Sequence, residues 1–160
     1  MGEADFESFC KEHFVSVSRT AFLITGDAEE AQDLAQEGFV RAYERWGRVS
    51  EMDRPDAWVH RVVTNLAISS WRRRRVRSRL QAPDPVVPEP DAPDLVLARA
   101  LRELPPAQRA AVVLRYYLDW SATESAEALG KNPSTVRALT HQGLLRLREL
   151  MGEELNDDRA

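Results

Sequence analysis

The sequence has little of several features that define common protein classes. Its 160 residues include one cysteine, Cys10, so neither an internal disulfide nor a zinc-finger ligand set is available. No apolar run approaches the roughly 20 residues needed to cross a bilayer, and the acidic start MGEADFESF is unlike a basic signal region. No alternating β pattern and no internal repeat is present. We therefore expect an all-α protein that stays in the cytoplasm without inserting into a membrane.

Groups that would support catalysis or metal binding are also sparse. His13, His60 and His141 are scattered without ligand spacing, and neither a glycine-rich phosphate loop nor a Ser/His/Asp arrangement is present. An acidic stretch could suggest a metal, but a di-iron bundle needs Glu-x-x-His pairs, which the sequence lacks. We expect no enzyme, no metal and no cofactor. The acidic stretch comprises Asp27, Glu29, Glu30, Asp33 and Glu37.

The net charge of −4 conceals two blocks of opposite sign. Residues 1–53 carry twelve acidic and five basic side chains, whereas residues 54–80 carry one acid and eight arginines. The run WRRRRVRSR, residues 71–79, combines a tryptophan that can stack on an unpaired base with arginines that bind phosphate. A solvated helix end is the alternative interpretation. The blocks favour one surface for nucleic acid and another for a different partner.

Five prolines between residues 82 and 94 forbid a continuous helix or a central strand. We place a Pro-rich acidic linker at 81–94, between lobes at 1–80 and 95–152, with an acidic tail at 153–160. In an extended form of about 3.1 Å per residue the linker could span roughly 40 Å. A plain flexible spacer explains the composition equally well.

Apolar residues at helical spacing predict three helices before the linker, over about 4–24, 28–46 and from 55 into the arginine run. Gly26 is expected to end the first, and Asp27 to cap the second. After the linker we expect a short helix over 95–104 and another that opens at Pro106 and continues to about residue 118. The apolar positions of these helices include Phe9, Val17, Phe39, Tyr43, Val63 and Tyr117.

Residues 121–150 have the pattern of a helix-turn-helix. Ser121 and Glu124 form a capping-box pattern, and Gly130 suits the left-handed conformation that ends a helix. Asn132 and Pro133 then provide the start of a second helix. An ordinary helical hairpin with a solvated polar face is the alternative. The polar side, with groups that bind phosphates and base edges, carries Ser134, Thr135, Arg137, Ala138, His141, Gln142 and Arg146.

The residues also resemble a known family. The sigma-70 region 2 signature is similar to residues 30–43, EAQDLAQEGFVRAY. The segment that follows this signature in the family resembles residues 55–75, PDAWVHRVVTNLAISSWRRRR. Region 4 resembles residues 104–150. The two-lobe layout, with RTAFLITGD, YERWGRV and LRYYLDWS, resembles the extracytoplasmic function (group IV) sigma factors of a sigma-E-like branch. The resemblance implies a region 2 bundle of three to four helices, a four-helix region 4 and a role in promoter-specific initiation of transcription.

The resemblance also implies partners and roles for individual residues. Core RNA polymerase would be bound through its β′ clamp helices and β flap, and promoter DNA through the −10 and −35 elements; whether an anti-sigma protein binds is left open. The clamp helices would contact Asp33, Leu34, Gln36, Glu37, Phe39 and Arg41. The −10 element would contact Arg48, Arg54, Arg61, Asn65, Trp71, Arg72, Arg73, Arg74 and Arg75, with residues 48–55 as the loop that captures a flipped base. The −35 element would be read by the polar side of the second helix of the helix-turn-helix.

Some positions depart from the family pattern. Ser69 stands where an acid is frequent, Ser125 where isoleucine is frequent, and Lys131 where a small apolar residue is frequent. The last two are expected to weaken packing of the first helix of the helix-turn-helix. Basic residues common near Gln142 and Leu144 are missing, so we expect weak DNA binding without polymerase. The rival hypothesis is a free-standing helix-turn-helix regulator, but such a protein would not need the region 2 pattern. A DNA enzyme is a third hypothesis, for which the sequence offers no set of catalytic residues.

Overall fold

The structure, a computed structural model, describes residues 2–78 and 92–157, without the side chains of residues 71, 72, 74–78, 92–95 and 153–157. Every regular element in these ranges is a helix, which confirms the predicted all-α class. The chain divides into two compact units, Met1–Pro83 and Asp84–Ala160. Residues 81–91 of the predicted linker and residues 158–160 of the predicted tail lie outside the described ranges. The tail before them, up to Asp157, continues the last helix.

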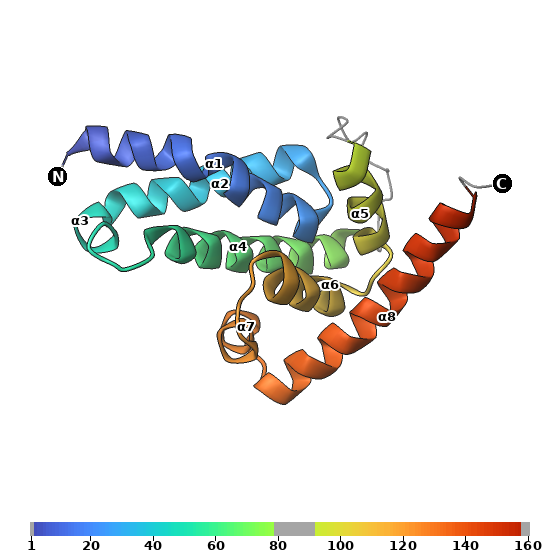
Figure 1. Cartoon of the computed structure of the whole chain (residues 1–160). Helices are drawn as coiled ribbons and strands as arrows, with labels where there is room; N and C mark the ends of the chain where they lie inside the picture. Colours follow the sequence, from blue (N-terminus) through green and yellow to red (C-terminus); the bar gives the residue numbers. More distant parts are fainter. Residues whose placement is uncertain (1, 79–91, 158–160) are drawn as a thin grey trace. The chain divides into compact units, whose positions relative to one another are not determined.

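Unit 1 contains four helices (Figure 1), namely α1 (Glu3–Thr25), α2 (Ala28–Glu44), α3 (Trp46–Val49) and α4 (Pro55–Ser78). Gly26 ends α1 with φ 73°, and the Asp27 carboxylate accepts the Glu30 amide hydrogen at 3.1 Å, so both predicted caps are confirmed. Helical periodicity predicted three helices and missed α3, whereas the family resemblance implied three to four, which is confirmed. Because Arg45 leaves helical geometry, the chain turns after Glu44 and α3 forms as a separate element.

The core of unit 1 lies where α1, α2 and α4 pack against one another. Its members are apolar side chains that recur at helical spacing and include Phe9, Val17, Phe39, Val59 and Val63. Tyr43 was predicted as an apolar core position but is 51% exposed. Its ring packs against Phe6, with 5.1 Å between the ring centroids.

Gly38 permits the close approach of α2 to α4. It is buried, and a Cβ atom at this position would overlap the Val63 side chain. The glycine therefore sets the separation of the two helices.

Unit 2 contains α5 (Ala92–Arg102), α6 (Pro106–Val112), the π-helical turn η1 (Val113–Tyr117), α7 (Ala122–Leu129) and α8 (Pro133–Asp157). The helix predicted to run on from Pro106 instead widens at η1, where the Leu118 amide donates to the Val113 carbonyl at 3.1 Å. Asp119 then takes a left-handed conformation with φ 56°. This irregular turn leaves Tyr117 41% exposed, contrary to its predicted apolar role.

Helix α8 organises unit 2, because α5, α6 and α7 all pack against it. The guanidinium of Arg109, 7% exposed, donates to the carbonyls of Arg102 and Leu104 at 3.2 Å each, satisfying acceptors at the end of α5. Ser125 on α7 is fully buried and its hydroxyl has no partner among the described residues, in keeping with weakened packing there. Lys131 is exposed, and its effect on the packing of α7 stays a prediction.

We predict that Gly38→Ala destabilises unit 1 by about 1–3 kcal/mol, because the added methyl group overpacks the α2–α4 contact. Hydrogen exchange of amides in α2 and α4 measures the change. Gly47→Ala is the matched control, since nothing lies within 4 Å of its Cβ position, and it should not destabilise the unit. Equal exchange in both variants would contradict the packing role of Gly38.

Candidate nucleic-acid interface

The helix-turn-helix forms from the capping groups that the sequence predicts. The Ser121 hydroxyl accepts the Glu124 amide hydrogen at 3.0 Å and donates to the Glu124 carboxylate at 3.1 Å. The first half of the capping box is thus confirmed, while the carboxylate binds the hydroxyl instead of the Ser121 backbone. Gly130 ends α7 with φ 65°, as predicted.

The N-terminus of α8 is closed by Asn132. Its side-chain oxygen accepts the Thr135 amide hydrogen at 2.9 Å and the Ser134 hydroxyl hydrogen at 2.7 Å. Pro133 is the first helical residue, where its missing N–H is no loss. These contacts fix the residue at which α8 begins. They thereby fix the direction in which the polar side of α8 points.

The predicted polar side of α8 is accessible. Val136 and Leu147 are buried on the opposite side, while Thr135 is half-buried. The exposed members of the predicted set are Ser134, Arg137, Ala138, His141, Gln142 and Arg146. Their spacing places them along one flank of the helix, so the structure brings together what the sequence grouped.

Besides Ser134, which donates to Asn132, two of these side chains are engaged in contacts that sequence reasoning missed. Gln142 accepts a hydrogen bond from Gln108 of α6 at 3.4 Å, and Arg146 pairs with Glu149 at 3.0 Å. Leu145, 48% exposed, is a further apolar member of the accessible surface. Leu145 lies two helical turns after Ala138, and this spacing could have predicted that it shares the accessible flank.

The predicted −10 residues of unit 1 lie on α3, the following loop and α4. Arg48, Arg54, Arg61 and Asn65 are exposed, and the last two are one turn apart on α4. Arg73 is also exposed and lies further along this helix. The side chains of Trp71, Arg72, Arg74 and Arg75 lie outside the described set, although α4 continues through these positions.

Helix α2 carries the predicted polymerase contacts. Asp33, Gln36, Glu37 and Arg41 are exposed, with Glu37 and Arg41 paired at 3.1 Å, and Leu34 is half-buried. Phe39 cannot be a surface contact, because it is 5% exposed and packs against Phe9 and Phe14 with ring centroids 5.8 Å away in each case.

Val40 is an exposed residue of α2 that the sequence analysis missed. It is 52% exposed, and its spacing puts it on the same flank as Gln36 and Glu37. An apolar side chain out of phase with the core was the signal that could have found it.

Two family models match the chain, sigma-70 region 2 over residues 10–77 and sigma-70 region 4 over residues 94–147. The RNA polymerase sigma-E factor of Streptomyces avermitilis is 35% identical over 161 residues, covering 98% of this chain and 90% of that protein. The ECF RNA polymerase sigma factor SigL of Mycobacterium tuberculosis is 32% identical and covers 89% of this chain and 86% of its own length. The chain belongs to the extracytoplasmic function sigma factors of the sigma-70 family.

The fold of this sigma factor also matches a solved relative. The sigma factor RpoE of Bartonella quintana, solved in complex with the anti-sigma factor NepR, aligns with a TM-score of 0.75 at 22% identity, covering 92% of this chain and 97% of that one. Unit 1 corresponds to region 2 and unit 2 to region 4. Within the described ranges, no helix is both long and apolar enough to cross a membrane.

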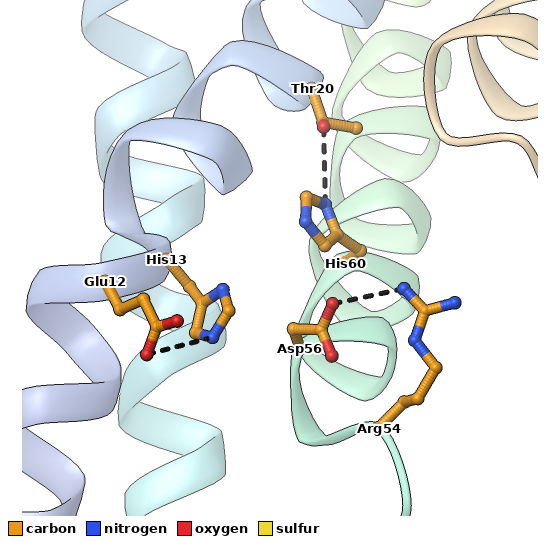
Figure 2. Close-up of polar contacts among 6 residues, drawn as sticks. All are labelled: Glu12, His13, Thr20, Arg54, Asp56 and His60. Atoms are coloured by element: carbon orange, nitrogen blue, oxygen red, sulfur yellow. Dashed lines mark hydrogen bonds and ion pairs between the residues drawn. The ribbon is translucent and has the colours of Figure 1, made fainter.

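The start of α4 in region 2 is organised by polar contacts (Figure 2). Arg54 pairs with Asp56 at 3.2 Å, which ties the loop to the first turn of the helix. Partial burial raises the pKa of Asp56, but the hydrogen bond and charge of Arg54 outweigh it and the pKa is lowered overall. One predicted −10 residue is therefore held in place by a carboxylate.

His60, one turn further along α4, is buried against α1. Its Nδ1 atom lies 3.3 Å from the Thr20 hydroxyl, and that hydroxyl donates its hydrogen to the Ser16 carbonyl at 3.1 Å. Because the hydroxyl has only one hydrogen, the imidazole must donate from Nδ1, which fixes its tautomer. Burial lowers the pKa of His60 to about 4, with His13 and Arg54 acting in the same direction and Asp56 opposing them.

A polar cavity of about 440 Å³ lies between α2 and α4. The Ser70 hydroxyl donates to Glu30 at this place, and Arg73 lies beside the carboxylates. In the part of the chain that the structure describes, no group of three or more His, Cys, Asp or Glu residues could hold a metal. The cavity is lined by Asp27, Glu29, Glu30, Asp33, Leu34, Ser70 and Arg73.

We predict that region 2 loses stability as the pH falls from about 6.5 to 4. The unfolded state binds a proton on His60 in this range while the folded state does not, and the full difference is about 3 kcal/mol. Hydrogen exchange of the Val63 amide at several pH values measures it. His60→Gln removes this titration and should flatten the dependence; a slope identical to that of the parent protein would refute the assignment to His60.

Proposed function

We infer that this sigma factor binds core RNA polymerase and directs initiation of transcription at promoters with −10 and −35 elements. The observation that carries the inference is the presence of regions 2 and 4 in one chain, each with an accessible polar face. Synthesis of RNA belongs to the polymerase, and the factor is assigned no catalytic role. We place its action in the cytoplasm, where polymerase and DNA meet.

We propose α2 as the docking element for the clamp helices of the polymerase β′ subunit. Asp33, Gln36, Glu37 and Arg41 offer charged and polar groups, and Val40 adds apolar area at the same flank. Leu34 contributes its exposed part. Phe39 supports the helix from the core and gives the docking face its orientation.

We propose α4 and the loop before it as the −10 site. Residues 48–55, from the end of α3 through the loop to the first residue of α4, capture a flipped base, and Arg54 pairs with Asp56 there. Arg61 and Asn65 continue this surface along α4 and hold the melted strand, together with Trp71 and the arginines 72–75. Arginine suits phosphate recognition because its guanidinium makes two parallel hydrogen bonds.

We propose α8 as the reader of the −35 element in the major groove. A recognition helix reads bases mainly with its N-terminal part, where Ser134, Arg137 and Ala138 lie. His141, Gln142 and Arg146 lie further along and contact bases or the backbone beyond. Residues 1–80 and 95–152 are thus assigned to separate promoter elements, joined by the segment 81–94.

Two further partners belong to this proposal. The β flap of polymerase is assigned to region 4. An anti-sigma protein is a candidate regulator, because the fold is shared with a sigma factor that was solved in complex with one.

We predict promoter-specific run-off transcripts when the purified factor is added to core polymerase and a promoter template library. Co-purification with core and transcripts that begin at fixed sites are the expected results. Absence of both would sink the proposal, whereas specific DNA binding without any polymerase association would favour a free-standing regulator.

We also predict that Asp33→Arg combined with Glu37→Arg weakens binding to core polymerase more than about tenfold, or 1.4 kcal/mol, by placing like charges against the docking surface. Fluorescence titration of labelled factor with core measures the affinity. Glu3→Arg with Glu7→Arg is the matched control, because these residues share the spacing, exposure and charge change on α1. Equal losses in the two double variants would mean that the docking surface is misplaced.

A further inference from the structure

Gln142 differs from the other predicted −35 residues in having its amide oxygen engaged by another helix. The Nε2 atom of Gln108, on α6, donates to its Oε1 atom at 3.4 Å. Gln142 is exposed while Gln108 is half-buried, so the contact lies at the edge of the accessible face of α8.

The contact exists because α6 and α8 meet at Gly143. A Cβ atom on Gly143 would lie 2.7 Å from Val112 Cγ2 and 3.4 Å from the Gln108 carbonyl oxygen. The absent side chain lets α6 lie close enough for Gln108 to reach the residue that precedes the glycine. Gln108 and Val112 are one turn apart, so α6 presents them together to α8.

This contact restricts what Gln142 offers to a ligand. A glutamine amide has one acceptor oxygen and two N–H donors, and its pairing with adenine uses both kinds of group. Gln108 takes one of the two lone pairs of this oxygen and holds the oxygen toward α6, so the NH2 group lies on the other side of the amide, away from Gln108. The fixed amide therefore suits hydrogen-bond acceptors, which promoter DNA supplies on phosphates, guanine and thymine.

We propose that Gln108 is a positioning residue that holds the Gln142 amide with its N–H donors toward an acceptor on promoter DNA. The inference rests on the proposed function of α8 as the −35 reader. Gln108 itself touches no base; it acts through Gln142. The acceptor is a base edge or a phosphate oxygen, and the experiment separates the two.

The test is a double-mutant cycle on the full-length factor with core polymerase. Gln108→Met and Gln142→Met remove the amides while retaining side chains of similar length, and the far-UV circular dichroism and melting temperature of each variant report whether it folds. A template library randomised over the −35 element is transcribed, and the templates that yield transcripts are sequenced. We expect the effects to be coupled by roughly three- to tenfold, so that Gln108→Met has little effect once Gln142 is replaced.

A third variant reverses the amide. The carboxylate in Gln108→Glu accepts from Nε2 of Gln142 and turns Oε1 outward, which should shift the selected base toward adenine or cytosine, whose exposed amino groups are donors. The same substitution in the Gln142→Met background corrects for the added charge. A coupled loss that is equal on all templates identifies a phosphate as the acceptor, and the salt dependence of binding should stay unchanged because the amide carries no charge.

Additive effects of Gln108→Met and Gln142→Met would overturn the positioning role. Failure of the parent protein to enrich any template would instead overturn the proposed function. Selection by the parent protein, together with an unchanged profile and unchanged transcript yield for both Gln108 variants, would leave that function standing and refute this inference.

Discussion

Close helix approach at two glycines is the constraint on which both units depend. At Gly38 the backbone of α2 lies against Val63 of α4, and at Gly143 the backbone of α8 lies against Val112 of α6. A side chain at either position would separate the helices and move the surfaces that they carry. In region 2 this contact orients α2, the proposed docking helix, against α4, and in region 4 it brings Gln108 close to the proposed reading face of α8. Packing geometry therefore sets the functional geometry.

Within that frame, polar groups are placed by local hydrogen bonds. Asp27, Ser121 and Asn132 satisfy the first amides of their helices, which fixes where α2, α7 and α8 begin. Arg109 satisfies the carbonyls that end the helix before it. Because these groups lose little freedom on binding, the accessible side chains of α8 are presented on a rigid support. Such preorganisation suits a reader that must discriminate between similar promoter sequences.

Acidic and basic residues are separated along the chain but come together in the folded structure. The acidic first third and the arginine-rich segment meet at the cavity between α2 and α4, where Arg73 lies beside carboxylates, and Arg54 is paired with Asp56. Two arginines of the proposed −10 site thus lie next to acidic neighbours that partly neutralise them. The net charge of −4 is consistent with the expectation that the factor binds DNA weakly without polymerase.

Local patterns in the sequence were enough to predict the all-α class, the helix-turn-helix and its caps, because apolar spacing and the residues at helix ends act over a few positions. It grouped the exposed residues of α8 correctly and indicated the family through the region 2 pattern. Only the tertiary structure decided that Phe39 belongs to the core, that the helix after Pro106 widens at Val113–Tyr117, and that Gln142 is engaged by Gln108. The contacts of Phe39 and Gln142 join residues about thirty positions apart in the chain, which helical periodicity does not encode, and the widening at Val113–Tyr117 departs from that periodicity locally.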